Sequence, residues 1–199
     1  VMNENLIFFW EWFSQNEEYI YEELETNTDN IAFLIAEQLK VVHSDLVFEI
    51  SFEKEDNKMT FVISADGDIA LFPLVIELCG KAPTYERWNI VAFRPRLKQQ
   101  NQVIEIDGIK LDYDDVYFTY STEDDFINLD IYIKGYDQED NRYIHTYFIL
   151  LDSLIGEFDA VTKIGLTTVF SYIEDEVLMN IRELTKIIDF LQNKDLSLN

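Results

Sequence analysis

The sequence predicts an α+β fold: a mostly antiparallel sheet from two strand–strand–helix–strand units, an N-terminal helical hairpin and an added C-terminal helix. Two pairs of segments alternate apolar and polar residues with the period of a half-buried strand, and each pair spans a short polar turn. Elsewhere, apolar residues recur at three- and four-residue spacing, as in amphipathic helices. The 199 residues are 48% hydrophobic, enough for a core. This length predicts a single domain over residues 1–199, and the alternative is two small halves that share a core.

Residues 5–41 have the pattern of a helical hairpin, in which the polar residues 26–30 separate two helices. The first helix carries a long apolar stripe, made of Leu6, Phe9, Trp10, Phe13, Ile20 and Leu24. The second carries a shorter one, made of Ile31, Leu34, Ile35 and Leu39. We expect both stripes to face the sheet, whereas Trp12 lies off the first stripe and is a candidate contact residue.

Residues 45–96 form the first predicted strand–strand–helix–strand unit. Two alternating stretches, residues 46–53 and 59–66, flank a charged turn and predict a hairpin. A short helix follows, with its apolar residues at Leu71, Leu74, Val75 and Leu78. Residues 88–93 are apolar on both faces, as in a central strand, which we expect to extend to residue 96.

Residues 103–168 repeat this plan. Residues 116–121 and 127–134 predict a second hairpin, and alternation over residues 158–164 predicts a closing strand. Between them lies a helical stripe, made of Ile144, Tyr147, Phe148, Leu151 and Leu154. Because the order of elements is the same in both halves, we predict an internal duplication.

A C-terminal helix is predicted over residues 171–193. Ser171 and Glu174 have the spacing of a capping box. The apolar stripe that follows consists of Ile173, Val177, Ile181, Leu184, Ile188 and Leu191. This stripe has to be buried, either on the sheet of the same chain or in a homodimer formed through this helix.

The charge of the chain restricts its partners. There are 39 acidic and 15 basic residues, for a net charge of -24, and both halves of the chain are acidic. Nucleic acid and anionic membrane surfaces are therefore excluded as expected partners, since both need Lys and Arg. A strong negative field favours encounter with a basic protein. The alternative is that the charge only keeps an aromatic-rich protein soluble.

Cys79 is the lone cysteine, so no intrachain disulfide can form and a zinc cluster is not expected. The apolar run at residues 6–10 is too short to span a bilayer, and no basic segment precedes it as in a signal peptide. We therefore expect a cytoplasmic protein.

No familiar catalytic motif is present. Phosphate-binding, dinucleotide-binding, serine-hydrolase and zinc-protease signatures are all missing from the sequence. His43 is expected in a helix-to-strand connection and His145 in a helix, where either is a base or a structural residue. We predict no catalytic residue, cofactor or metal, and we regard an enzyme as the less favoured class.

The turn Asp66-Gly67-Asp68 has two interpretations. Carboxylate oxygens are ligands for hard cations, but the further ligands of a calcium loop are missing here. The favoured interpretation is turn geometry plus capping, with Asp68 accepting from free N–H groups at the start of the next helix.

Basic residues gather at Arg87, Arg94, Arg96 and Lys98, against the trend of the composition. On a strand running to residue 96, Arg94 and Arg96 share a face at its carboxyl end, where open α/β sheets place ligand sites. Arginine pairs bind carboxylates or phosphates bidentately. The alternative is that these arginines pair with the chain's own Asp and Glu residues.

The closing strand adds three further candidates. Period-two counting places Glu157, Asp159 and Lys163 on one face. If the two halves pack pseudo-symmetrically, these residues approach Asp66 and Arg94. Such a set fits either general acid–base chemistry or a surface ion-pair network.

Several separated motifs resemble an uncharacterised bacterial protein family. They are ISADGD at residues 63–68, Phe72-Pro73, Ala82-Pro83, Trp88, FRPR at residues 93–96 and LLDSLIGEFDAVTKIG at residues 150–165. With the Trp10-x-Trp12-Phe13 start, the resemblance covers residues 5–168, and it implies no activity.

The preferred function is a protein-interaction module that binds a basic partner, in an immunity-like or antitoxin-like role. The alternative is a small-anion-binding protein or enzyme with a pocket around Arg94 and Arg96.

Overall fold

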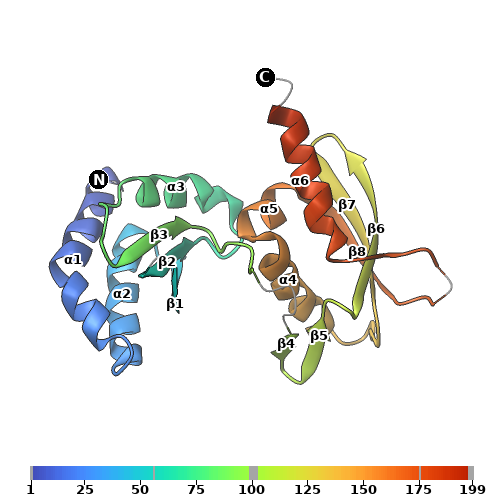
Figure 1. Cartoon of the computed structure of the whole chain (residues 1–199), viewed down its shortest axis with the longest axis horizontal. Coiled ribbons are helices and arrows are strands. Elements are labelled where there is room, and N and C mark those ends of the chain that lie inside the picture. Colours follow the sequence, from blue (N-terminus) through green and yellow to red (C-terminus); the bar gives the residue numbers. More distant parts are fainter. Residues whose placement is uncertain (1, 56, 99–102, 175, 197–199) are drawn as a thin grey trace. The chain divides into compact units, whose positions relative to one another are not determined.

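The structure is a computed structural model that describes residues 2–55, 57–98, 103–174 and 176–196. It confirms the α+β class, with helices and mostly antiparallel sheets (Figure 1). Contacts within the chain cluster into two compact units, Val1–Arg94 and Pro95–Asn199. The single domain over residues 1–199 stays a prediction.

The first unit begins with the expected helical hairpin. Its helices are α1 (Met2–Glu23) and α2 (Thr28–Val42). Strands β1 (Val47–Glu55) and β2 (Lys58–Ser64) pair antiparallel. The chain then passes through a 3-10 turn, η1 (Ile69–Leu71), and helix α3 (Phe72–Gly80), and returns as β3 (Trp88–Ala92), parallel to β2. The first strand–strand–helix–strand unit is thus present, in the order β1-β2-β3.

Aromatic packing joins α1 to this sheet. The ring of Phe13 lies 5.3 Å from that of Phe61 on β2 and 5.7 Å from that of Trp88 on β3. All three side chains are buried, and burial of each contributes about 1.5–3 kcal/mol. Glu17 of α1 accepts hydrogen bonds from Trp88 Nε1 at 2.8 Å and from Arg87 Nε at 3.0 Å. The predicted apolar stripe of α1 is therefore its core-facing side.

The second unit opens with a hairpin that the sequence analysis did not anticipate, β4 (Val103–Ile106) and β5 (Ile109–Asp112). The expected hairpin follows as β6 (Val116–Glu123) and β7 (Phe126–Ile133). Helices α4 (Arg142–Ile155) and α5 (Glu157–Thr162) lead to β8 (Ile164–Ser171), which is parallel to β7. A short strand, β9 (Met179–Asn180), and helix α6 (Glu183–Leu196) complete the unit, whose main sheet has the order β8-β7-β6-β9.

The core of the second unit lies between one face of this sheet and helices α4 and α6 (Figure 1). Alternate residues of β7 are buried, from Ile127 through Leu129 and Ile131 to Ile133, as the period-two pattern predicts. They pack with buried residues of α4 and with Ile181, Leu184 and Ile188.

Both units share one topology, in which a hairpin is followed by a helical connection and a strand parallel to the second hairpin strand. Parallel neighbours require such a crossover, and helices provide it in both cases. Internal duplication remains a hypothesis that rests on this shared order.

The closing strand expected over residues 158–164 is wrong, because residues 157–162 form α5. Gly156 has a φ of 83°, a left-handed conformation that suits glycine, and it ends α4 and starts the new helix. Glu157 and Asp159 lie in the first turn, where carboxylates are favoured by the helix dipole. The strand of this region is β8, which begins at Ile164, has no charged residue and is rich in β-branched residues.

The C-terminal helix is shorter than expected. Ser171 ends β8, and the helix begins at Glu183, so Ser171 and Glu174 form no helix cap. Ile173 and Val177 lie outside the helix and are 44% and 99% exposed. The buried residues of the predicted stripe, Ile181, Leu184 and Ile188, pack into the core of the second unit. Among the described helices, none combines the length and apolar character needed to cross a membrane.

The buried hydroxyl of Tyr147 on α4 gives a first prediction. Tyr147 is completely buried, and its Oη has no hydrogen-bond partner among the described residues. An unsatisfied buried hydroxyl destabilises the folded state, so Tyr147→Phe should raise the free energy of unfolding by about 1 kcal/mol. Urea unfolding followed by far-UV circular dichroism measures this change. Tyr143→Phe, at a half-buried position of the same helix, is the control, and its effect should stay within about 0.5 kcal/mol. A clear loss of stability in Tyr147→Phe would contradict the prediction.

Candidate functional site

The basic cluster is not arranged as one strand face. β3 ends at Ala92, and Phe93 has a φ of 67°, which turns the chain out of the strand. The expectation that Arg94 and Arg96 share a face at the end of a strand is therefore wrong. Each arginine belongs to a different compact unit.

Arg94 pairs with carboxylates of the first unit. Its Nη2 donates to Asp66 at 3.0 Å, and its Nε donates to Glu49 on β1. Asp66 has a φ of 50° in the turn after β2, and its N–H donates to Ser64 Oγ at 2.9 Å. The structure thus brings together two predicted site residues, Asp66 and Arg94, in a contact that ties this turn to the outer strand.

Arg96 pairs with carboxylates of the second unit. Its guanidinium donates to Asp159 at 2.8 Å, to Asp189 at 2.6 Å and to the carbonyl of Ile155 at 2.9 Å. Burial alone would lower the pKa of Arg96, but its hydrogen bonds with the two aspartates offset this and hold the pKa above its ordinary value. Arg96 therefore joins the end of α4 to α5 and α6.

The other candidates, Glu157, Asp159 and Lys163, lie along or at the end of helix α5. Glu157 is completely buried at the start of α5. Lys163 caps the other end, where its N–H donates to Asp159 O at 2.9 Å and its carbonyl accepts from Ile127 N at 2.8 Å. Glu157, Asp159 and Lys163 therefore do not form the predicted strand face.

The turn Asp66-Gly67-Asp68 has the predicted capping role. Asp68 caps η1, with its side chain accepting from Ala70 N at 2.9 Å. Among the described residues, no group of three or more His, Cys, Asp or Glu side chains has a metal-binding arrangement. The turn is accounted for by its hydrogen bonds.

The residues with the best nucleophilic or basic chemistry are dispersed. His43 ends α2, and its Nδ1 accepts from Asp45 N at 3.2 Å. His145 is exposed on α4. Burial raises the pKa of the Cys79 thiol to about 12, so it is protonated at neutral pH. His43 Nδ1 also lies 3.9 Å from an Asp45 carboxylate oxygen, but both side chains are exposed, and neither His145 nor Cys79 lies beside them in the sequence or on the same helix.

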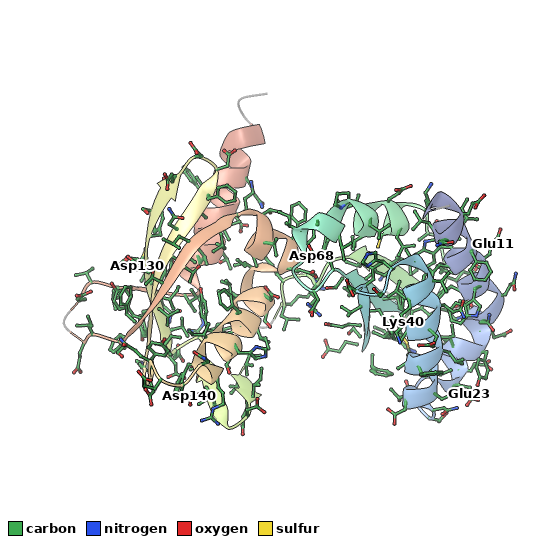
Figure 2. The ribbon with its side chains drawn as sticks, turned by 180° about the vertical axis from the view of Figure 1, so that it is seen from behind. Glu11, Glu23, Lys40, Asp68, Asp130 and Asp140 are labelled. Atoms are coloured by element: carbon green, nitrogen blue, oxygen red, sulfur yellow. The ribbon has the colours of Figure 1, made fainter. Side chains whose placement is uncertain are left out.

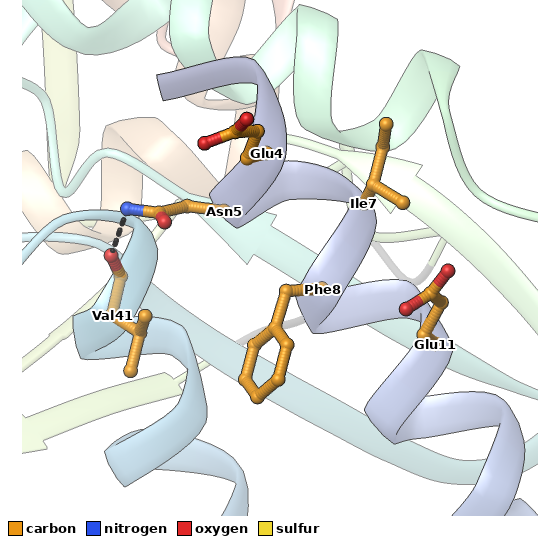
Figure 3. Close-up of a pocket in the computed structure, with 6 residues that line it drawn as sticks. All are labelled: Glu4, Asn5, Ile7, Phe8, Glu11 and Val41. Atoms are coloured by element: carbon orange, nitrogen blue, oxygen red, sulfur yellow. Dashed lines mark hydrogen bonds between the residues drawn. The ribbon is translucent and has the colours of Figure 1, made fainter. Parts of the chain in front are cut away.

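An exposed apolar groove between α1 and α2 is the clearest surface feature of the first unit. It has a volume of about 510 Å³ and is lined by Glu4, Asn5, Ile7, Phe8, Glu11 and Val41. Ile7, Phe8 and Val41 are 49%, 51% and 46% exposed. Figure 3 shows Phe8 and Val41 projecting from the two helices, with Glu4 before and Glu11 after Phe8 along α1. Asn5 Nδ2 donates to Val41 O at 2.8 Å and fixes the spacing of the helices at this end.

A second hollow continues along the other side of α1. It has a volume of about 540 Å³ and is lined by Ile7, Trp10, Glu11, Ser14, Gln15, Lys81 and Pro83. Ile7 and Glu11 border both hollows and form a ridge between them. We call the two hollows and this ridge the α1 groove.

The α1 groove was not among the sites predicted from the sequence. Residues 6–10 are apolar without interruption, and a helix packed on one side cannot bury all five. Leu6, Phe9 and Trp10 occupy the core, so Ile7 and Phe8 must lie outward. The sequence therefore indicates an exposed apolar surface on this helix, because it has more apolar residues than its buried stripe can hold. Trp12, the predicted contact residue, is half-buried.

Charged side chains surround the groove and the rest of the molecule. Figure 2 shows side chains on both units, with Glu11 and Glu23 labelled on α1, Lys40 on α2, and Asp130 and Asp140 in the second unit. Lys40 is paired with Glu37 at 2.7 Å, within α2. The groove thus combines exposed apolar side chains with the carboxylates of Glu4 and Glu11, and Lys81, the one cation among the described residues that line it, is paired with Glu77 at 3.7 Å.

Comparison with known proteins gives no assignment: no family model, curated protein or solved structure matches the chain. The resemblance to an uncharacterised bacterial family stays a prediction. The function has to be argued from the surfaces described above.

The contacts of Arg94 and Arg96 yield a second prediction. Arg94 pairs with two exposed carboxylates, whereas Asp159, one of the partners of Arg96, is only 13% exposed. Arg96→Lys should lower the free energy of unfolding by about 2 kcal/mol, because a lysine cannot bind all three acceptors. Arg94→Lys should cost less than about 1 kcal/mol, as exposed pairs do.

Two spectroscopic signals separate these effects. All three tryptophans lie in the first unit, so fluorescence follows the unfolding of that unit and far-UV circular dichroism follows both. A structural role for the arginines would be contradicted if both variants kept the free energy of unfolding of the unaltered chain but no longer bound a small anion.

Proposed function

We propose that the chain is a protein-interaction module whose α1 groove binds a basic, amphipathic segment of a partner protein. The observation that carries this proposal is the exposure of Ile7, Phe8 and Val41 in one groove beside Glu4 and Glu11. An amphipathic helix binds such a groove with its apolar face, and its cationic residues then meet the carboxylates of Glu4 and Glu11. An immunity-like or antitoxin-like role in the cytoplasm, as expected from the sequence, belongs to this proposal.

The charge of the chain supports a basic partner. With a net charge of -24, the chain attracts cationic proteins over a range set by the Debye length, about 10 Å at 0.1 M salt. Long-range attraction accelerates encounter, while the exposed apolar side chains of the groove supply contacts that persist in salt. Binding should therefore weaken with salt without disappearing.

The alternative, a small-anion site around Arg94 and Arg96, has less support. Both guanidinium groups are engaged by carboxylates of their own units. An anion would have to displace these carboxylates in a molecule whose field already repels it. No observation on the described residues favours this alternative over the groove.

A defined peptide tests the proposal. The probe is a fluorescently labelled helical peptide of leucine and lysine, and its comparison is the same peptide with glutamate in place of lysine. The full chain should bind the lysine peptide in fluorescence anisotropy, and the double variant Ile7→Ser/Phe8→Ser should weaken binding at least about tenfold, as expected for the loss of two apolar contacts.

The matched control is Phe33→Ser. Phe33 is 62% exposed on α2 and does not line the groove, so its replacement should leave the affinity unchanged. Glu4→Gln/Glu11→Gln should reduce the salt dependence of binding. Equal binding of both peptides, or unchanged affinity in the Ile7/Phe8 variant, would refute the groove as the binding site.

A further inference from the structure

Strand β8 is an unprotected edge of the main sheet in the second unit. It ends the strand order β8-β7-β6-β9, so within the described residues no strand pairs with its outer side. Its eight residues, IGLTTVFS, include no charged residue, whereas 27% of the chain is charged. Leu166 is 72% exposed and Phe170 is 37% exposed. A long uncharged edge of this kind is a template for pairing with another strand.

The two edges of the sheet in the first unit differ from β8. β1 carries Glu49, Glu53 and Lys54, and charged side chains on an edge strand oppose pairing with a second strand. β3, which corresponds to β8 in the shared topology, is also uncharged, but it has only five residues, and all of them are buried or half-buried. β8 is therefore the edge that is long, uncharged and exposed.

The outward backbone groups of β8 are regularly spaced over its second part. The pairing with β7 is irregular only near the start of β8, where Asn128 Oδ1 accepts from Leu166 N at 2.8 Å. From Thr167 to Ser171 the register is continuous. Tyr172 N donates to Ile133 O on β7, so alternation directs the N–H and C=O groups of Thr167, Val169 and Ser171 away from β7.

We propose that two copies of this chain associate through β8, with the two strands antiparallel about a twofold axis at Val169. Thr167 of each copy then lies opposite Ser171 of the other, and the outward backbone groups of both strands pair. On the open face of the sheet, Thr168 lies beside Phe170 of the second copy, a favourable cross-strand pair. Phe170 is already held by stacking on Tyr132 at 5.4 Å.

Charge complementarity at the strand ends supports a second copy as the occupant. Lys163 directly precedes β8, and Glu174 is exposed shortly after it. In the antiparallel arrangement, the Lys163 end of each copy meets the Glu174 end of the other, and the twofold axis repeats this contact. A basic partner gains little on β8, because the strand has no carboxylate of its own to bind cations.

The molecular mass of the full chain tests this proposal. Light scattering coupled to size exclusion should give twice the 23.6 kDa of one chain at high protein concentration. Thr168→Lys places a charge on the edge at an exposed position and should halve that mass. The matched control is Ser121→Lys, which adds the same charge at an exposed position of β6, two strands away from β8 on the same sheet. This control should remain dimeric.

Hydrogen exchange provides a second measurement on the unaltered chain. In a dimer, the outward amides of Thr167, Val169 and Ser171 should exchange more slowly as the protein concentration rises. A monomeric mass at every concentration would overturn the proposal. A dimer that Thr168→Lys leaves intact, or whose formation does not protect these amides, would also overturn it and would indicate another surface.

Discussion

The scarcity of cations is the constraint on which this structure depends. Asp and Glu outnumber Lys and Arg by 39 to 15. Most carboxylates therefore have to be solvated by water, and each basic side chain can pair with only one or two of them. The five arginines all hold acceptors that are distant in sequence. Arg87 binds Glu17 in α1, and Arg182 binds Asp114, 68 positions away. Each of these contacts fixes two separate segments against the repulsion of a strongly negative chain.

The ion pairs of three lysines are local instead. Lys40, Lys81 and Lys186 pair with a glutamate three or four positions away on the same helix. Pairs of that kind contribute only a few tenths of a kcal/mol. Lys58 and Lys134 reach distant segments too, but each of them donates there to a backbone carbonyl. The planar guanidinium of arginine can bind two acceptors at once, whereas the ammonium group is a flexible point charge. Arg96, with two aspartates and a carbonyl, uses this geometry most fully.

The sequence predicted the parts of the fold that periodicity controls. The hairpins β1–β2 and β6–β7 and the stripe of α1 were recognisable because their apolar residues repeat over many positions, whereas the four-residue strands β4 and β5 are too short for such a repeat. The error at residues 158–164 arose where seven residues fit both periods, and Gly156 decided in favour of a helix. The arginines could not be assigned from spacing, because their partners lie 28–93 positions away and are determined by tertiary structure. The α1 groove could have been anticipated from the surplus of apolar residues in the first helix.

The order in which the arginine contacts can form follows the order of synthesis. Glu17, Glu49 and Asp66 all precede their arginines, so every ion pair described for the first unit can close once residue 94 has emerged. Arg96 emerges directly afterwards, but its partner Asp189 follows 93 positions later. The first unit can therefore form these ion pairs on the ribosome, whereas the second has to wait until Asp189 has emerged. A nascent chain arrested near residue 180 would hold a finished first unit beside an arginine that still lacks its later aspartate.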